Sequence, residues 1–403
     1  MTWGHVVSTD LVHWRELGDA ILPDKRGTVF SGSAVVDVRN DSGLSDNGAA
    51  VLCAFYTAAG RYAPRPQPFT QCLAYSLDGG RTWNRYTGNP VLAEIRPANR
   101  DPKVFWHARS KRWIMVLYVR RGAYSIFSSR DLRAWRFESE ALFRGAYECP
   151  ELFALPVDGN AMDVRWVLWS ASGDYLIGRF DGKRFEPESD VLRTEWGPNF
   201  YAAQTWNNAP GGRRILIAWM RSDGAAYRGM PFNQQMTVPR ELSLRRTEEG
   251  IRLFAYPVRE LERLRVQSRR IGPIHLGRGQ RRWQMQVPAL LDVELELTAD
   301  VAVSLDVRGV QIDFDAARGR LACLGTTIEG LPKGGPLELR MLVDRTSLEI
   351  FIARGRYVLS YCFPFGDTPG RLVLEVGRGQ ADVMLQLHTL RSIWDRHEAH
   401  AGG

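Results

Sequence analysis

Lysine is scarce in this 403-residue sequence, and its scarcity limits what the net charge of +8 can mean. Only five of the 53 basic residues are lysines, and the arginines are spread along the chain. The densest group of arginines runs from Arg263 to Arg282, with no aromatic side chain before Trp283. Nucleic-acid-binding surfaces cluster their cations and place aromatic side chains among them. The pattern therefore favours a solvated face, and we expect no nucleic-acid partner.

Cysteine is also sparse. The five cysteines are an odd number, widely spaced, with no Cys-x-x-Cys pair and no partnered histidine. These features exclude a disulfide framework or a zinc site as the organising principle. Cys53 and Cys72 could meet on neighbouring strands, but two buried thiols is the simpler interpretation. Because no Asp/His cluster has metal-ligand spacing either, we expect no cofactor and no metal.

Long apolar runs and helical periodicity are missing as well. No run approaches the roughly 20 apolar residues of a membrane helix, so we expect no membrane partner. The dominant pattern is apolar runs of about five to eight residues bounded by Gly, Asp, Asn and Pro, which is typical of strands and turns. Residues 257–266 alone have helical spacing. The sequence therefore predicts an all-β protein with a partly helical linker at residues 257–282.

A short motif repeats along the first half of the chain. A Ser-x-Asp turn that ends in an aromatic residue occurs at residues 8–14, 76–83 and 129–135, and a degenerate copy occupies residues 180–185. The Asp side chain of such a turn can accept hydrogen bonds from backbone N–H groups of a hairpin. Units of about fifty residues, each long enough for four short strands, are typical of propeller blades. We therefore predict a β-propeller domain over residues 1–256.

The pattern of apolar and polar residues changes after residue 283. Residues 293–297, 337–341, 347–352 and 372–376 alternate strictly between apolar and polar side chains. This is the pattern of half-buried antiparallel strands in a sandwich. We predict a β-sandwich domain at residues 283–392 and a polar, frayed tail at residues 393–403.

Two carboxylates precede prolines on this scaffold. Asp101 lies in Arg-Asp-Pro, before an apolar strand, and Glu148 lies in Tyr-Glu-Cys-Pro-Glu, about fifty residues later. The inner strands of all blades line one channel, so acids far apart in sequence can converge at its mouth. Small apolar neighbours would keep Glu148 protonated as a general acid, and Arg100 could bind either a carboxylate or a sugar hydroxyl. Such a pair suggests glycosidic-bond chemistry.

The same motifs resemble those of glycoside hydrolase family 32, which includes invertases, levanases, inulinases and fructan fructosidases. The resemblance covers nearly the whole chain, in the family's order, at residues 3–14, 30–37, 100–106, 147–153, 199–206, 217–220, 239–244 and 347–351.

This resemblance implies a five-bladed propeller, with an incomplete first blade, followed by a β-sandwich, and hydrolysis of β-D-fructofuranosidic bonds with retention. By motif match, Glu148 would be the acid/base and Asp101 the transition-state stabiliser. The subsite for the terminal fructose would be lined by Phe30, Ser31, Arg100 and Trp219. The substrate would be a small or polymeric fructoside, with sucrose, inulin and levan all open.

The chain departs from the family pattern in one respect. Family members carry a Trp-Met-Asn-Asp-Pro-Asn-Gly motif, whose Asp is the nucleophile, upstream of the Trp-Gly-His run that begins at Trp3 in this chain. No Asn-Asp-Pro occurs in the 403 residues, and Asp41 follows Asn40 but precedes Ser42. We therefore expect a fragment that is inactive as written. For the full-length protein, a secreted or periplasmic location is favoured over a cytoplasmic one.

Two alternatives stay open. The missing nucleophile motif favours a non-catalytic carbohydrate-binding propeller, whereas the presence of both Asp101 and Glu148 in intact surroundings disfavours it. The more remote alternative is a sialidase-like hydrolase, because residues 76–83 also fit the Asp-box of sialidases, which are propellers too. Exo- or endo-action and the oligomeric state stay open as well.

Overall fold

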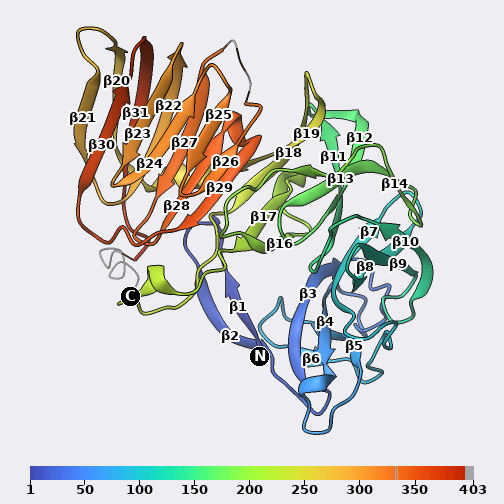
Figure 1. Ribbon diagram of the computed structural model, residues 1–403. Helices are drawn as coiled ribbons and strands as arrows, with labels where there is room; N and C mark the ends of the chain where they lie inside the picture. Colours follow the sequence, from blue (N-terminus) through green and yellow to red (C-terminus); the bar gives the residue numbers. More distant parts are fainter. Residues whose placement is uncertain (332, 334, 395–403) are drawn as a thin grey trace. The chain divides into compact units, whose positions relative to one another are not determined.

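The computed structural model describes residues 1–331, 333 and 335–394, and in these residues the chain is all-β, with only short 3-10 helices beside the strands. It divides into two compact units (Figure 1). Unit 1 comprises residues 1–193, 202–217 and 241–252, and unit 2 comprises residues 194–201, 218–240 and the chain from 253 onward. Among the described residues, no helix has the length and apolar character needed to cross a membrane.

Five antiparallel groups of strands follow one another along the first 257 residues, and they are the blades of a five-bladed propeller whose first blade has two strands. The first three groups are β1 (Trp3–Val7) and β2 (Arg15–Ile21); β3 (Thr28–Asp37), β4 (Val51–Ala59), β5 (Phe69–Ser76) and β6 (Asn84–Arg85); and β7 (Arg100–His107), β8 (Arg112–Arg120), β9 (Ala123–Ser129) and β10 (Arg136–Leu142).

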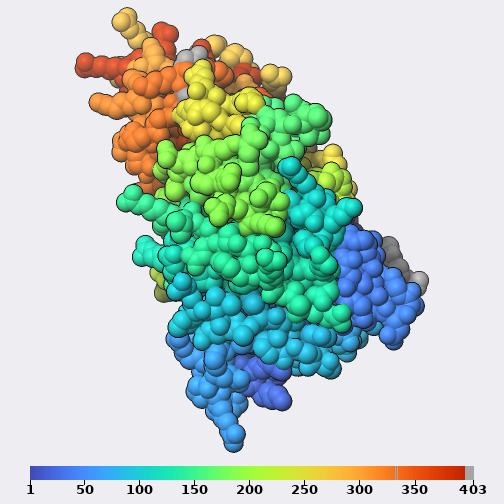
Figure 2. Space-filling model, turned by 90° about the vertical axis from the view of Figure 1, so that its right-hand side faces the viewer, coloured from blue at the N-terminus to red at the C-terminus, as the bar shows by residue number. Residues whose placement is uncertain are grey.

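The last two groups are β11 (Glu151–Val157), β12 (Asn160–Trp169), β13 (Asp174–Phe180), β14 (Phe185–Pro187) and β15 (Leu192–Arg193); and β16 (Tyr201–Thr205), β17 (Ile215–Trp219), β18 (Arg240–Thr247) and β19 (Gly250–Pro257). A single parallel bridge between Val157 and Leu244 joins these two groups. In Figure 2 the successive segments of unit 1 form neighbouring bands, from light blue to green, in chain order.

The repeated Ser-x-Asp motif occupies equivalent hairpins, as the sequence predicts. The four copies join β1 to β2, β5 to β6, β9 to β10 and β13 to β14. In each hairpin the Asp side chain accepts one or two backbone N–H groups of the turn. Asp10, for example, accepts those of Val12 and His13 at 3.0 and 2.8 Å. The repeat therefore marks the last hairpin of four blades.

The sandwich consists of two six-stranded sheets that form two layers in Figure 1. One sheet has the order β20-β31-β22-β27-β28-β29 and the other β21-β30-β23-β24-β25-β26. The strands are β20 (Arg265–Leu276), β21 (Arg282–Val287), β22 (Leu291–Ala299), β23 (Ala302–Val307), β24 (Val310–Asp315), β25 (Arg320–Cys323), β26 (Thr326–Ile328), β27 (Leu337–Val343), β28 (Ser347–Ile352), β29 (Tyr357–Cys362), β30 (Gly370–Val376) and β31 (Ala381–Leu390).

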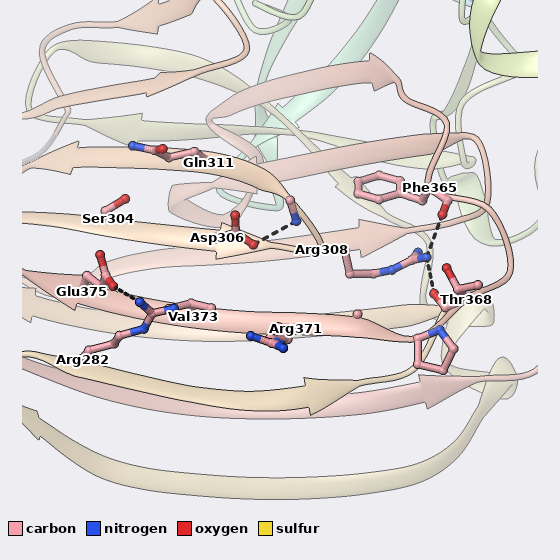
Figure 3. Close-up of a pocket in the computed structure, with 13 residues that line it drawn as sticks. Arg282, Ser304, Asp306, Arg308, Gln311, Phe365, Thr368, Arg371, Val373 and Glu375 are labelled. Carbon is pink, nitrogen blue, oxygen red and sulfur yellow. Dashed lines mark hydrogen bonds and ion pairs between the residues drawn. The ribbon is translucent and has the colours of Figure 1, made fainter.

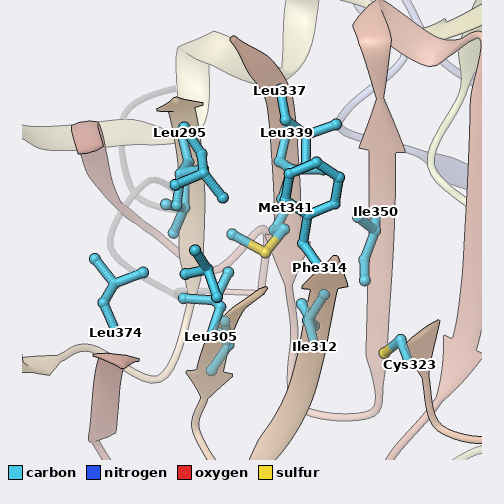
Figure 4. Close-up of a cluster of buried hydrophobic side chains, with 14 of the residues drawn as sticks. Leu295, Leu305, Ile312, Phe314, Cys323, Leu337, Leu339, Met341, Ile350 and Leu374 are labelled. Carbon is cyan, nitrogen blue, oxygen red and sulfur yellow. The ribbon is translucent and has the colours of Figure 1, made fainter. Parts of the chain in front are cut away.

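The sandwich core lies between these two layers. Leu295, Met341 and Ile350 of one sheet face Leu305 and Leu374 of the other (Figure 4). Each is buried because alternate residues of a strand point to the same face, so the strict alternation seen in the sequence becomes a continuous apolar layer.

The predicted linker at residues 257–282 is wrong over most of its length. A 3-10 helix at Arg259–Leu264 is followed directly by β20, which pairs along its length with β31. Most side chains of β20 are exposed, so the strand lacks the apolar alternation that would have revealed it. The other short 3-10 helices are Gly60–Tyr62, Pro210–Gly212, Ala225–Tyr227 and Ala353–Gly355. The predicted frayed tail lies outside the described residues from position 395 onward.

All five cysteines are free thiols. In the paired strands β4 and β5, Cys53 lies opposite Tyr75 and Cys72 opposite Tyr56, so the two thiols do not face each other. Both are buried, which confirms the simpler interpretation of the sequence.

Candidate active site

Asp101 lies at the start of β7, where the strand is distorted. The pairing of β7 with β8 shifts register between Arg100 and Lys103, and the backbone of Asp101 has φ of 62°. A left-handed backbone at a residue other than glycine is uncommon and is concentrated at functional sites. The Asp101 backbone N–H donates to Thr57 Oγ1 at 3.0 Å, which holds this conformation against β4.

The Asp101 side chain is almost completely enclosed, with 4% of the residue exposed. Its Oδ2 accepts hydrogen bonds from the backbone N–H of Cys149 at 3.1 Å and from Cys149 Sγ at 3.6 Å. Burial raises the pKa of the Asp101 carboxyl to about 6, although the Cys149 N–H and the Arg100 guanidinium partly oppose this effect. The group therefore changes charge in a mildly acidic range.

Glu148 lies in the turn before β11, and its side chain is 23% exposed. Arg100 donates to Glu148 Oε1 from Nε at 2.9 Å and from Nη2 at 2.5 Å, and its third nitrogen donates to the carbonyl of Ala98. The Arg100 guanidinium also lies 4.5 Å from the centre of the Tyr118 ring. The sequence left open whether Arg100 binds a carboxylate or a sugar hydroxyl, and in the structure it binds a carboxylate. The surroundings of Glu148 are therefore not only apolar, as expected from the sequence, but also include the Arg100 cation.

The two carboxylate motifs meet although they are 48 residues apart. Arg100 donates to Glu148, and Cys149, the residue after Glu148, donates to Asp101. Two hydrogen-bonded contacts therefore join the two motifs. One carboxyl is enclosed and the other reaches solvent. Two titratable groups in contrasting environments can take different roles in acid–base chemistry.

Two buried polar residues that the sequence analysis did not single out, Thr57 and Gln71, hold the segment around Arg100 and Asp101 in place. Thr57 Oγ1 donates to Gln71 Oε1 at 2.7 Å, and Gln71 Nε2 donates to the carbonyl of Asn99 at 3.3 Å, so the segment before Arg100 is tied to β4 and β5. Thr57 and Gln71 are fully buried. The available signal was a polar residue inside an otherwise apolar strand, because buried polar groups are retained where they are hydrogen-bonded.

A buried ion pair joins Lys103, two residues after Asp101, to Glu151, three residues after Glu148. Lys103 Nζ is 2.8 Å from Glu151 Oε1 and donates to the Thr205 carbonyl at 2.6 Å, while Thr205 Oγ1 donates to Glu151 Oε2 at 2.6 Å. Burial lowers the pKa of Lys103. This cluster links β7, β11 and β16 directly behind the carboxylates.

The other predicted site residues are placed as follows. Phe30 packs its ring 5.7 Å from that of Tyr62 and 5.6 Å from that of Phe69, centre to centre. Ser31 is exposed in a β-bulge, since the pairing of β3 with β4 shifts register between Phe30 and Gly32. Trp219 belongs to unit 2, where its Nε1 donates to Gln234 Oε1 at 2.6 Å.

No group of three or more His, Cys, Asp or Glu side chains placed to hold a metal ion occurs among the residues that the structure describes. The groups that meet at this site are two carboxyls, a guanidinium and the Cys149 thiol.

The family is decided by a match to the model of the "Glycosyl hydrolases family 32 N-terminal domain", which covers residues 1–257. The chain belongs to glycoside hydrolase family 32. A levanase of Bacillus subtilis is 33% identical to this family 32 chain, and the match covers 98% of this chain and 65% of the levanase. An extracellular exo-inulinase of Aspergillus ficuum is 29% identical, with 98% of this chain and 88% of that protein covered.

Solved structures agree with the family 32 fold. The exo-inulinase of Aspergillus awamori has a TM-score of 0.85 at 26% identity and covers 98% of this chain and 90% of its own. A fructofuranosidase of Schwanniomyces occidentalis has a TM-score of 0.84 at 23% identity, over 97% and 89% of the two chains. The chain spans 65% and 49% of the lengths of two Bacillus levanases that it matches.

Proposed function

We propose that the protein cleaves β-D-fructofuranosidic bonds with retention of configuration. The observation that carries the proposal is the meeting of the two motifs, in which Arg100 holds Glu148 while the Cys149 N–H holds Asp101. Relatives named levanase and exo-inulinase support a fructoside as the substrate.

Glu148 is the acid/base in this proposal. Its carboxyl reaches solvent and is oriented by Arg100. In the first step it gives its proton to the glycosidic oxygen as the bond from that oxygen to the anomeric carbon breaks. In the second step the carboxylate takes a proton from the water that attacks the same carbon.

Asp101 is the transition-state stabiliser. Its enclosed carboxylate would accept hydrogen bonds from fructose hydroxyls, and its charge would favour the positive charge that develops on the sugar ring. Phe30, Ser31 and Arg100, all of unit 1, are proposed to line the subsite for the terminal fructose.

The retaining route also needs a nucleophilic carboxylate on the other face of the sugar. The 403 residues contain no Asn-Asp-Pro run, so the family's nucleophile is not among them. We therefore expect the 403-residue polypeptide to bind fructosides with negligible turnover, and the same polypeptide extended by the family's Asn-Asp-Pro-Asn-Gly segment to hydrolyse them.

The test measures hydrolysis of sucrose, inulin and levan by both polypeptides. Efficient turnover by the 403-residue polypeptide would show that another group acts as nucleophile. Binding without turnover by both polypeptides would favour the alternative of a non-catalytic carbohydrate-binding propeller, which the missing motif also suggests.

The role of Glu148 is tested in the extended polypeptide with Glu148→Gln. We expect sucrose hydrolysis to fall by roughly 10²–10⁴-fold, because the leaving oxygen no longer receives a proton. Cleavage of an aryl β-D-fructofuranoside with an acidic phenol should fall far less in its first step, since that leaving group needs no proton. Glu186→Gln, an exposed carboxylate on β14, is the matched control. Equal losses on both substrates would contradict the assignment.

A further inference from the structure

A hollow of about 520 Å³ opens on the outer face of the sandwich sheet that contains β21, β30, β23 and β24 (Figure 3). Its volume falls within the roughly 300–1,000 Å³ of small-molecule sites. The residues that line it are Arg282, Ser304, Asp306, Arg308, Gly309, Gln311, Phe365, Thr368, Pro369, Gly370, Arg371, Val373 and Glu375. They all belong to unit 2, and the carboxylate site of unit 1 uses none of them.

The floor of the hollow is a rigid grid of strand residues. Asp306 of β23 lies between Val373 of β30 and Gln311 of β24, and Ser304 lies opposite Glu375 in the same pairing of strands. The residues between them along the strands, such as Leu305 and Leu374, point inward and are buried in the sandwich core. The outward side chains are therefore held in place by the packing beneath them.

One wall of the hollow is a loop clamped by Arg308. The Arg308 guanidinium donates to the carbonyls of Phe365, Gly366 and Thr368 at 3.1, 3.2 and 2.7 Å, and to that of Ala289 at 2.7 Å. It also lies 4.9 Å from the centre of the Phe365 ring. Arg308 and Gly309 form the two-residue turn between β23 and β24, with φ of 53° and 90°, which directs this side chain toward the loop. The wall is preorganised.

The polar groups of the hollow alternate between donors and acceptors. The carboxylate of Glu375 pairs with Arg282 at 2.9 Å, and the carboxylate of Asp306 is oriented by the backbone N–H of Gly309 at 2.9 Å. Arg371 and Ser304 offer donors beside them, and Gln311, whose Nε2 donates to Asp313 at 2.9 Å, offers its Oε1 as an acceptor. Sugar hydroxyls both donate and accept, so this mixture suits neighbouring hydroxyls, and the Phe365 ring offers an apolar face. Arg282 is paired with Glu375, Arg308 is bound to four carbonyls, and Asp306 lines the hollow together with Arg371. The guanidiniums are therefore largely compensated, which disfavours a phosphate or another polyanion.

We propose that this hollow is a second carbohydrate-binding site, which holds a segment of a fructan chain on the sandwich. The choice of fructan as the occupant rests on the proposed function. The chemistry of the hollow itself requires only a neutral, polyhydroxylated ligand of this size.

The experiment is calorimetric titration of the 403-residue polypeptide with a short fructo-oligosaccharide. We expect two sites per chain. Asp306→Ala with Arg371→Ala should weaken one of them by about tenfold or more, as expected for the loss of charge-assisted hydrogen bonds. Gln311→Ala, a milder change on the same exposed face, should weaken the same site. Gln286→Ala is the matched control, because it lies on β21 outside the hollow.

Unchanged stoichiometry and affinity in both the double variant and Gln311→Ala would overturn the proposal. Displacement of the oligosaccharide from this site by inorganic phosphate would also overturn it, since the site would then be an anion site. Asp101→Ala with Glu148→Ala separates this proposal from the proposed function. If that variant changes nothing while the sandwich variants still remove a site, the proposed function fails and the hollow stands.

Discussion

The Asp101 carboxyl is almost completely enclosed, and its Oδ2 accepts hydrogen bonds from Cys149. Burial raises its pKa from 3.8 to about 6. Between these two values the folded protein holds a proton that the unfolded chain has lost. The contribution of Asp101 to the free energy of unfolding is therefore most favourable below about pH 4, and it becomes unfavourable as the pH rises through about 6.

We predict that Asp101→Asn removes this dependence. At about pH 4 the two proteins should have similar free energies of unfolding, and at about pH 8 the variant should be more stable by on the order of 2–3 kcal/mol, which corresponds to the pKa shift. Asparagine also tolerates the left-handed backbone at this position. Urea unfolding of both proteins at the two pH values measures the difference. A difference that does not change with pH would show that burial does not raise the pKa of Asp101.

At this scale the sequence predicted that the Arg-Asp-Pro and Glu-Cys-Pro segments converge, and the structure brings them into contact, whereas the roles of Asp101 and Glu148 stay predictions. The sequence left open whether Arg100 binds a carboxylate or a sugar, because that choice depends on where the turn before β11 lies. Thr57 and Gln71 stand out in the sequence as polar residues inside apolar strands, but their hydrogen-bond partners could not be predicted, because those partners depend on how the strands pair.

At the scale of elements, the bulge in β3 depends on Gly32. A Cβ at this position would collide with the backbone carbonyl of Phe55 in β4. Because that contact is with backbone, the strand itself would have to move, and with it the exposed Ser31 and the neighbouring Phe30. We predict that Gly32→Ala lowers the free energy of unfolding by about 2–4 kcal/mol, within the range of severe single substitutions.

Gly4→Ala is the matched control for Gly32→Ala. Gly4 also lies in a strand, β1, but nothing lies within 4 Å of its added Cβ. Its free energy of unfolding should stay within about 0.5 kcal/mol of the parent value. Equal effects of the two substitutions in thermal unfolding would show that the close approach of β3 to β4 relaxes without cost.

The Lys103–Glu151 pair holds three strands of unit 1 together behind the carboxylates. Both residues are at most 2% exposed, so removing one partner leaves the other charge buried without its ion-pair partner. We predict that Lys103→Met or Glu151→Gln costs about 3–5 kcal/mol in the free energy of unfolding, and that the double variant recovers a large part of that loss. A double-mutant cycle measured by urea unfolding tests this. Additive losses would show that the two side chains do not interact.

Strands were predicted well where they are half-buried and poorly where they are exposed. The strands of the sandwich from 293 onward alternate because one face of each sheet packs on the other. Strand β20 has most of its side chains in solvent, so its arginines resembled a linker although its backbone pairs with β31. Backbone hydrogen bonding does not require a particular side-chain pattern, so a strand with mostly exposed side chains cannot be predicted from apolar alternation.

At the scale of the whole molecule, repeats and alternation predicted a propeller followed by a sandwich. They did not predict that residues 194–201 and 218–240 group with the sandwich strands in unit 2. The contacts responsible are ion pairs and hydrogen bonds between residues as far as 109 and 120 positions apart, such as those of Arg240 with Glu349 and Ser360. Such long-range pairing has no periodic pattern to read.

Arg240 is the centre of that group, and it is 1% exposed. It donates to Glu195 Oε2 at 2.7 Å, to Glu349 Oε2 at 2.6 Å and to Ser360 Oγ at 2.6 Å. Its guanidinium lies 5.3 and 5.2 Å from the ring centres of Phe200 and Phe351. One cation therefore neutralises two buried carboxylates from different segments of unit 2.

We predict that Arg240→Leu destabilises unit 2 by about 3–5 kcal/mol, because it leaves two buried carboxylates without their cation. Burial raises the pKa of Glu195, so its protonated form is the less costly one in the fold; the loss should shrink on acidification and grow as the pH rises. Adding Glu195→Gln and Glu349→Gln should restore most of the stability at neutral pH. Calorimetric unfolding of the three proteins tests this, and a single variant that melts with the parent at neutral pH would show that Arg240 does not hold these segments together.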